Sequence, residues 1–199
     1  RLRLVLGHRP PSGKRVAVVT GTGGAAAMVA DRLGTLGAEV APPPPAVVDQ
    51  LAGRNIRIAP AAIPDVPMGR GEGGVHSTIL SALLASDHCD AVVSVVGSSS
   101  RSKEVLVGRV LGATGLSRKP LAVFLAPRAD EGLALLEENG IAGFRTPETC
   151  ADAVNAYLNW KEPGPRDTRV GPEIAAAAAL ARQARGTRLN EHDSCALFA

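Results

Sequence analysis

The chain has 199 residues, of which 45% are hydrophobic and 21% charged, and its formal net charge is +3 at pH 7. This composition is that of a globular domain with a short appendage, and no run approaches the roughly 20 apolar residues of a membrane span. Aromatic residues make up only 3% of the chain and the basic residues are scattered, which argues against a nucleic-acid partner.

The three cysteines, Cys89, Cys150 and Cys195, are far apart and odd in number. Without metal-ligand spacing, this pattern predicts reduced thiols of the cytoplasm, no disulfide framework and no metal site. The chain opens at Arg1 without a methionine and closes on a helical pattern. We therefore expect a piece of a longer protein.

Short apolar runs predict five strands, bounded by glycine, proline and small-residue turns. The expected strands are Arg15–Thr20, Ala38–Pro42, Asp90–Gly97, Lys119–Pro127 and Gly143–Pro147. Apolar residues at helical spacing predict helices between and after them. These cover 24–36, 46–52, 75–86, 103–111, 130–139 and 147–160, with Thr146 or Pro147 opening the last and Glu148 in its first turn.

Strands that alternate with helices predict an α/β fold with a parallel sheet, helices on both faces and right-handed crossovers. Five short strands favour a flavodoxin-like doubly wound sheet in the order 2-1-3-4-5. Four prolines, 42–45, are expected to stop the second strand without entering the next helix. Beyond Trp160 the sequence predicts a linker and then a helix from Pro172 to Gly186, with Asn190 capping another.

Two small-residue turns follow the first and third strands, "TGTGG" at 20–24 and "GSSSR" at 97–101. In the expected strand order both turns lie at the crevice where ligands bind to open α/β sheets. The first, Gly21, Thr22, Gly23 and Gly24, offers free backbone amides and a positive helix end. The second, Gly97, Ser98, Ser99, Ser100 and Arg101, offers hydroxyl groups and one guanidinium. Together they suit a phosphate or a carboxylate.

A dinucleotide site is an alternative, because Gly21, Gly23 and Ala26 satisfy the pattern G-x-G-x-x-G/A. The acidic residue that should follow the second strand is poorly matched, since Glu39 falls inside that strand and prolines follow it. The histidines have no ligand-like spacing. His76 stays a weak candidate for chemistry, His88 and Cys89 are expected in a surface turn, and Cys150 is expected to pack inside its helix.

Three stretches, Gly13–Val40, Asp87–Arg101 and Lys119–Leu158, resemble in that order the ligase-CoA domain of the NDP-forming acyl-CoA synthetases, relatives of succinyl-CoA synthetase. The similarity covers residue 12 to about 160, and the tail from Arg188 is similar to the start of an ATP-grasp domain. The resemblance therefore implies three parts. Residues 1–14 are a tail from a preceding domain, 15–160 the ligase-CoA domain, and 161–199 a linker and helices toward an ATP-grasp domain.

In that family ATP phosphorylates a histidine, the phosphoryl group passes to a carboxylic acid, and CoA captures the acyl phosphate. The resemblance thus implies CoA, ATP and Mg²⁺ in the parent enzyme, with a small carboxylic acid as substrate. It implies CoA-binding, phosphohistidine and ATP-grasp domains as partners, and it leaves an oligomer open. The phospho-acceptor histidine lies in a "SHTG"-like context that this chain lacks, so we expect no catalytic residue here.

By the same resemblance, Gly21–Gly24 form one of the helix N-termini that cradle the phosphohistidine, and Gly97–Arg101 hold the acyl carboxylate with Arg101 as charge partner. The sequence departs from the family where relatives show a segment like "NPVDLT". Asp65 keeps an acidic residue there, and a glycine-rich insertion, Gly69–Gly74, follows. Two other classes stay open, a non-catalytic acyl-CoA-sensing module and a nicotinamide-binding domain. We expect the isolated chain to be catalytically silent.

Overall fold

The computed structural model describes residues 4, 8–58, 61, 63–64, 74–97, 102–114, 117, 119–127, 129–162, 164, 171–183 and 195. It divides the chain into two compact units, Arg1–Lys161 and Glu162–Ala199. The first unit holds the sheet. In the second, the helix α9 covers Pro172–Gln183 and begins with Pro172 as expected. Among the described helices, none combines the length and the apolar composition needed to cross a membrane.

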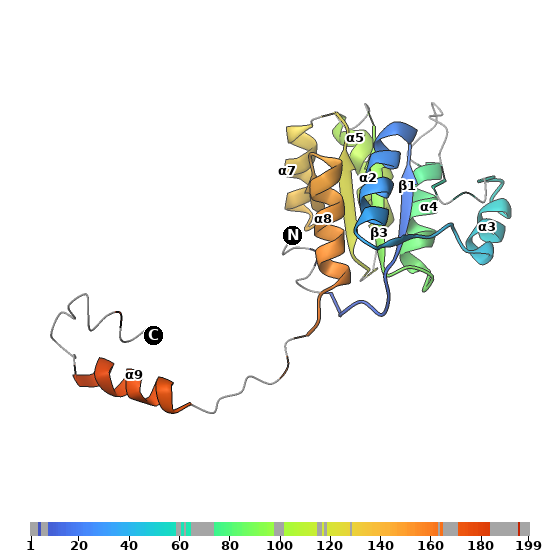
Figure 1. The fold of residues 1–199 in the computed structure, drawn as a ribbon. Coiled ribbons are helices and arrows are strands. Elements are labelled where there is room, and N and C mark those ends of the chain that lie inside the picture. Colours follow the sequence, from blue (N-terminus) through green and yellow to red (C-terminus); the bar gives the residue numbers. More distant parts are fainter. Residues whose placement is uncertain are drawn as a thin grey trace. The chain divides into compact units, whose positions relative to one another are not determined.

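The sheet has five parallel strands in the order β2-β1-β3-β4-β5, which confirms the predicted doubly wound fold (Figure 1). The strands are β1 Arg15–Thr20, β2 Glu39–Val40, β3 Ala91–Val96, β4 Leu121–Leu125 and β5 Ala142–Phe144. β1 pairs with β3 from Val16 opposite Ala91 to Thr20 opposite Val95. The chain order therefore reverses between β1 and β3, at the centre of the sheet.

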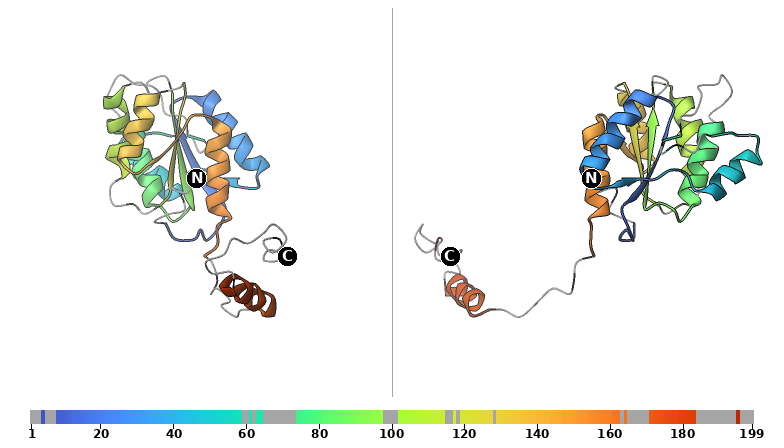
Figure 2. Two further views of the ribbon diagram at one scale, coloured as in Figure 1. Left: turned by 90° about the vertical axis from the view of Figure 1, so that its left-hand side faces the viewer. Right: turned by 45° about the vertical axis from the view of Figure 1, so that its right-hand side comes forward.

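Helices cover both faces of the sheet (Figure 2). One face carries α2 (Gly23–Thr35) and α8 (Pro147–Leu158). The other carries α3 (Pro45–Ala52), α4 (Gly74–Ala85), α5 (Lys103–Leu106) with the π-helical segment η2 (Val107–Leu111) and α6 (Gly112–Thr114), and α7 (Asp130–Glu138). Successive strand residues point to opposite faces, so Val16 and Val18 pack under α2 and α8, while Ala17 and Val19 pack under the other helices.

The two edge strands, β2 and β5, are shorter than the ranges predicted from the sequence, and β5 also begins one residue earlier. β2 contains only Glu39 and Val40, because the prolines that follow cannot donate to a ladder. β5 covers 142–144, not 143–147, because Thr146 is the N-cap of α8 and cannot also extend a strand. Other strand and helix ends also differ from their predictions by one or two residues, among them the first residue of α3 and the last residue of α8. Pro45 is the first residue of α3, since a proline at that position loses no helical hydrogen bond, and α8 ends at Leu158 and not at Trp160.

The helix predicted over 103–111 extends to Thr114 and contains the π-helical turn η2. Such a turn accommodates one extra residue, which shifts the register of the side chains that follow it. Here the extension brings the Ala113 carbonyl within 3.2 Å of the Ser81 hydroxyl on α4.

Of the two residues expected to open α8, Thr146 is the N-cap: its hydroxyl accepts a hydrogen bond from the Thr149 amide at 3.2 Å. Replacing Thr146 with alanine leaves that amide without its partner and should cost about 1 kcal/mol of unfolding free energy. Thermal unfolding should therefore shift down by about 2–4 °C. The variant Thr146→Ser keeps the oxygen and should match the wild type; equal destabilisation by serine and alanine would contradict the cap.

Asp90, directly before β3, fixes the chain segment that leads into β1. Its carboxylate accepts hydrogen bonds from the Ser12 amide and hydroxyl, the Gly13 amide and the Arg15 amide, at 2.8–3.1 Å. Partial burial acts against these bonds, but they outweigh it and hold the pKa of Asp90 below its usual value. The Tyr157 hydroxyl on α8 donates to the Arg9 carbonyl at 3.0 Å. Residues 9–15 are thereby held against the amino edge of the sheet.

Candidate functional site

The turn between β1 and α2 is held by the hydroxyl of Thr20. This buried oxygen accepts from the Thr22 amide at 2.8 Å and donates to the Thr22 carbonyl at 2.9 Å. The Gly21 amide donates to the Val95 carbonyl at 3.3 Å, which ties the turn to β3. The helix α2 then begins at Gly23, with the Ala26 amide donating to the Thr22 carbonyl.

The amides of Gly23, Gly24 and Ala25 have no acceptor among the described residues, because the Thr22 side chain does not cap the helix. No acidic residue lies in the first turn of α2. A Cβ built on Gly23 or Gly24 would meet no atom of the described residues within 4 Å. As far as the described residues go, the turn therefore presents unpaired amides and the positive end of a 13-residue helix without a neighbour in front of them, an arrangement suited to an anion.

The structure brings the start of the second predicted turn against the first. A Cβ added to Gly97 would lie 3.1 Å from the Thr22 Cβ and 3.2 Å from its Cγ2. Thr22 and Gly97, predicted from topology to share one crevice, are thus in contact at the carboxyl edge of the sheet. Ser98, Ser99, Ser100 and Arg101 lie outside the described residues, and their assignment stays a prediction.

Replacing Gly97 with alanine should push Thr22 away and destabilise the chain by about 1–3 kcal/mol, the usual cost of overpacking. Thr22→Gly supplies the matching space and is mild in itself, because glycine is accepted at an N-cap. Chemical denaturation of both single variants and the double variant gives the coupling. Gly97→Ala should cost much less on the Thr22→Gly background, and equal costs on both backgrounds would rule out the contact.

A third segment reaches the same edge, and sequence reasoning did not place it. The Thr20 amide donates to the Pro64 carbonyl at 3.5 Å, and Ile63 packs against the apolar cluster under α2 and α8. The sequence gives only a proline-rich loop here, and a loop has no periodicity to show which strand it returns to. Asp65, the acidic residue singled out by the resemblance, is next in the chain but lies outside the described residues, as does most of Gly69–Gly74.

His76, the one histidine kept as a candidate for chemistry, is a core residue. It is the third residue of α4, is 4% exposed, and its Nε2 lies 3.0 Å from the Ser94 hydroxyl oxygen on β3. Burial, and secondarily the positive charge of Arg109, lower the pKa of His76 to about 4. The imidazole is therefore neutral near pH 7, and the pair satisfies two buried polar groups inside the core.

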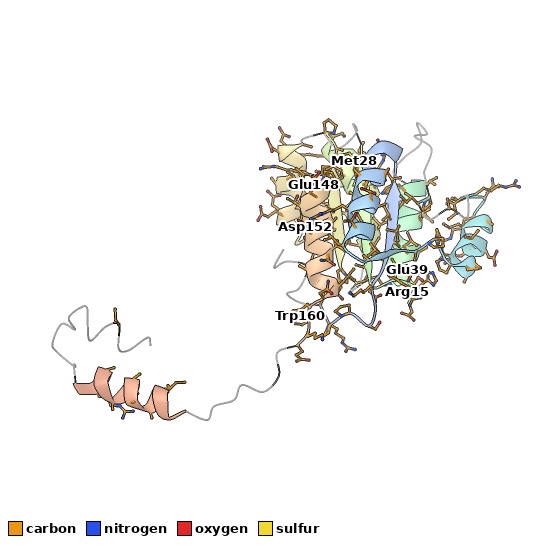
Figure 3. The ribbon with its side chains drawn as sticks, in the orientation of Figure 1. Arg15, Met28, Glu39, Glu148, Asp152 and Trp160 are labelled. Atoms are coloured by element: carbon orange, nitrogen blue, oxygen red, sulfur yellow. The ribbon has the colours of Figure 1, made fainter. Side chains whose placement is uncertain are left out.

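The geometry does not favour a dinucleotide. Glu39, the residue needed to bind a ribose, lies opposite Arg15 in the β1–β2 pair, at the amino edge (Figure 3). Gly21 follows the other end of β1. At about 3.3 Å per residue, that end of the strand is about 17 Å from Arg15. The carboxylate is thus at the wrong edge of the sheet for the fingerprint that Gly21, Gly23 and Ala26 would complete.

Of the cysteines in the first unit, one prediction is confirmed and one is wrong. Cys150 is fully buried, as expected for packing, and burial raises its pKa to about 12. Cys89 is 5% exposed and belongs to the core, whereas the sequence predicted a surface turn for it together with His88. The neighbouring aspartates suggested a surface, but Lys119 and the end of α4 cover the thiol. Among the described residues, no three histidine, cysteine or acidic side chains gather to hold a metal.

A wide groove of about 1280 Å³ lies at the opposite, amino edge, and we call it the amino-edge groove. Its walls include Ser12, Asp90, Lys119 and Tyr157. Its size does not make it the better site for a small anion. Asp90 is already saturated by the residues before β1, and the groove lies away from the strand ends where open α/β sheets bind ligands.

No protein-family model matches the sequence, and no curated protein sequence matches it. Solved structures do share its fold. One is PH0766 from Pyrococcus horikoshii OT3, with 22% identity and a TM-score of 0.66, covering 78% of this chain and 37% of that chain. Another is the dinucleotide forming acetyl-coenzyme A synthetase 1 of Ca. Korarchaeum cryptofilum in its apo form, with 22% identity, a TM-score of 0.62 and coverage of 78% and 35%.

The same synthetase in complex with phosphate and ADP matches with 23% identity, a TM-score of 0.62 and coverage of 78% and 34%. The first unit therefore has an NDP-forming acyl-CoA synthetase-like fold. The chain spans about a third of the length of each of these neighbours.

Proposed function

We propose that this chain is part of an acyl-CoA synthetase of the NDP-forming type and supplies one of the anion-binding turns of its phosphoryl-transfer site. The observation that supports this most is the start of α2, where the amides of Gly23, Gly24 and Ala25 have no acceptor among the described residues and lie where the strand order reverses. The fold is that of an acetyl-coenzyme A synthetase known in complex with phosphate and ADP. An arrangement of amides binds a phosphoryl group without a side chain that could react with it.

The reaction we assign to the longer protein has three reversible steps. ATP transfers its terminal phosphoryl group to a histidine of another domain, the phosphohistidine passes it to a carboxylate, and the CoA thiol displaces phosphate from the acyl phosphate. During the first two steps the amides of Gly23, Gly24 and Ala25 donate to phosphoryl oxygens. Gly97 and the hydroxyl-rich turn after it, with Arg101, orient the carboxylic acid.

ATP, Mg²⁺ and CoA are assigned to other domains of the longer protein, which we place in the cytoplasm. The segments 1–14 and 161–199 are assigned as connections to those domains, a CoA-binding domain before and an ATP-grasp domain after. The chain on its own is expected to be silent, since it lacks the phospho-acceptor motif. ATP-dependent thioester formation by residues 1–199 alone would contradict this assignment.

The test is phosphorylation of the full-length protein with γ-labelled ATP and magnesium. We expect an acid-labile, alkali-stable label, as phosphohistidine gives, which one member of a panel of carboxylic acids discharges together with CoA. That acid names the substrate. If no label forms while acyl-CoA esters still bind, the protein is a sensor with a silent ligase fold, and the proposed reaction is wrong.

A further inference from the structure

A thiol and an amine meet at the wall of the amino-edge groove. Lys119 lies just before β4, and Cys89 lies just before β3. The distance between the Lys119 Nζ and the Cys89 Sγ is 3.7 Å. Both atoms lie over the carboxyl end of α4, where the thiol is 3.8 Å from the Leu83 carbonyl and the amine 3.5 Å from it. Lys119 also donates to the Ser86 carbonyl. The thiol and the amine thus contact each other and the backbone carbonyls at the end of α4, and both residues line the amino-edge groove.

This pairing sets Cys89 apart from the other two cysteines. Cys150 belongs to α8 and is buried in the core beneath it, and this burial is the cause of its high pKa. Cys195 is exposed and lies in the second unit. Burial raises the pKa of Cys89 as well, but the positive charge of Lys119 opposes that rise. A small oxidant that enters the groove would therefore meet a thiol with a nitrogen nucleophile already beside it.

We propose that Cys89 and Lys119 form a covalent sulfur–nitrogen bond, a sulfenamide, when the protein meets hydrogen peroxide. The sulfur attacks the peroxide, whose O–O bond breaks, and sulfenic acid and water result. Lys119 gives up one proton to solvent, its nitrogen lone pair attacks the sulfur, and the S–O bond breaks; the leaving hydroxide takes a second proton from that nitrogen and becomes water. The sulfur is oxidised by two electrons and the peroxide reduced by two, so the protein loses two hydrogen atoms. Sulfenic acids are known to condense with a backbone nitrogen to a sulfenamide, and the link proposed here is the same reaction with a lysine amine.

The link would join the loop before β3 to the loop before β4, and these two strands are neighbours in the sheet. It would also take the amine away from the Leu83 and Ser86 carbonyls and shield the sulfur from further oxidation to sulfinic acid. Because sulfenamides are reopened by thiols, the state is reversible. It concerns the edge opposite the proposed phosphoryl site and does not depend on that proposal.

The experiment uses the full 199-residue chain with Cys195 changed to serine, treated with hydrogen peroxide at pH 8.5 and digested with trypsin. Trypsin releases Cys89 in peptide 71–101 and Lys119 in peptide 119–128. We expect mass spectrometry to find these two peptides joined, with a mass two hydrogens below their sum, and dithiothreitol to separate them. Lys119→Arg is the matched control, because arginine keeps the positive charge but its guanidinium does not deprotonate and attack.

In the Lys119→Arg variant, Cys89 should instead be captured by dimedone as sulfenic acid or proceed to sulfinic acid. Circular dichroism of both proteins before treatment shows whether the variant is folded. Joined peptides in the wild type and their absence in the variant support the link. Two results would overturn it: the same dimedone adduct on Cys89 in both proteins without joined peptides, or no oxidation of Cys89 at peroxide concentrations that oxidise Cys195 in the unsubstituted chain.

Discussion

Replacing Gly23 with valine should slow phosphoryl transfer in the full-length protein by about 100-fold or more, the scale on which loss of a backbone donor affects an anionic transition state. The new side chain enters the open space in front of the amides of Gly24 and Ala25, where we place the phosphoryl group. The fold should tolerate the change, because a Cβ at Gly23 meets no atom of the described residues within 4 Å. The measurement is the rate of labelling by γ-labelled ATP, together with thermal unfolding.

The chain offers a matched control in Gly34, near the other end of the same helix. Its Cβ position is also free of neighbours within 4 Å, and it too is exposed. Gly34→Val should therefore show the same small effect on unfolding and no effect on labelling. Equal labelling rates for the two valine variants would remove the α2 N-terminus from the phosphoryl site.

The second large effect concerns pH. His76 has a pKa of about 4 in the folded chain, against 6.5 as the ordinary value. Between these two values the unfolded chain binds a proton that the folded chain does not, so the folded state loses stability as the pH falls. The full difference corresponds to about 3 kcal/mol. The contribution of His76 is complete above pH 6.5 and lost by about pH 4, above the range in which Asp90 adds its own acid sensitivity.

Between pH 6.5 and pH 4, we expect the unfolding free energy of the His76→Gln variant to fall by about 3 kcal/mol less than that of the wild type. Glutamine keeps a polar atom for Ser94 but does not titrate. Urea unfolding at several pH values is the measurement. His88→Gln removes a different histidine and retains His76, so it should keep the wild-type slope. If the His76→Gln variant follows the wild-type pH profile, the assignment of a buried, neutral imidazole to His76 is wrong.

Most of the fold could be predicted because its signals are local. β1, β3 and β4 are β-branched apolar runs between turn residues, and the alternation with helices fixes a parallel sheet of known handedness. The errors concentrate where tertiary contacts decide. β2 and β5 are edge strands with few ladder bonds, so a neighbouring proline or an N-cap residue sets their ends. The π-helical turn in η2, which lies against α4, has no signal in the local sequence pattern.

Less of the candidate site could be predicted. The strand order was enough to bring Thr22 and Gly97 together, because parallel strands end at a common edge. The return of Ile63 and Pro64 to that edge depends on the path of a loop. The burial of His76 and Cys89 was missed for a related reason. Both are polar residues near helix or strand ends, and only partners distant in sequence, Ser94 and Lys119, make their burial favourable.

The close approach of Gly97 to Thr22 also has an evolutionary consequence. Two positions 75 residues apart share a single volume, so neither can gain a methyl group unless the other loses one. Among proteins that keep this turn, a residue larger than glycine at the position of Gly97 should therefore be accompanied by glycine at the position of Thr22. The two turns would then diversify as one paired unit, by coordinated steps at the ends of both strands.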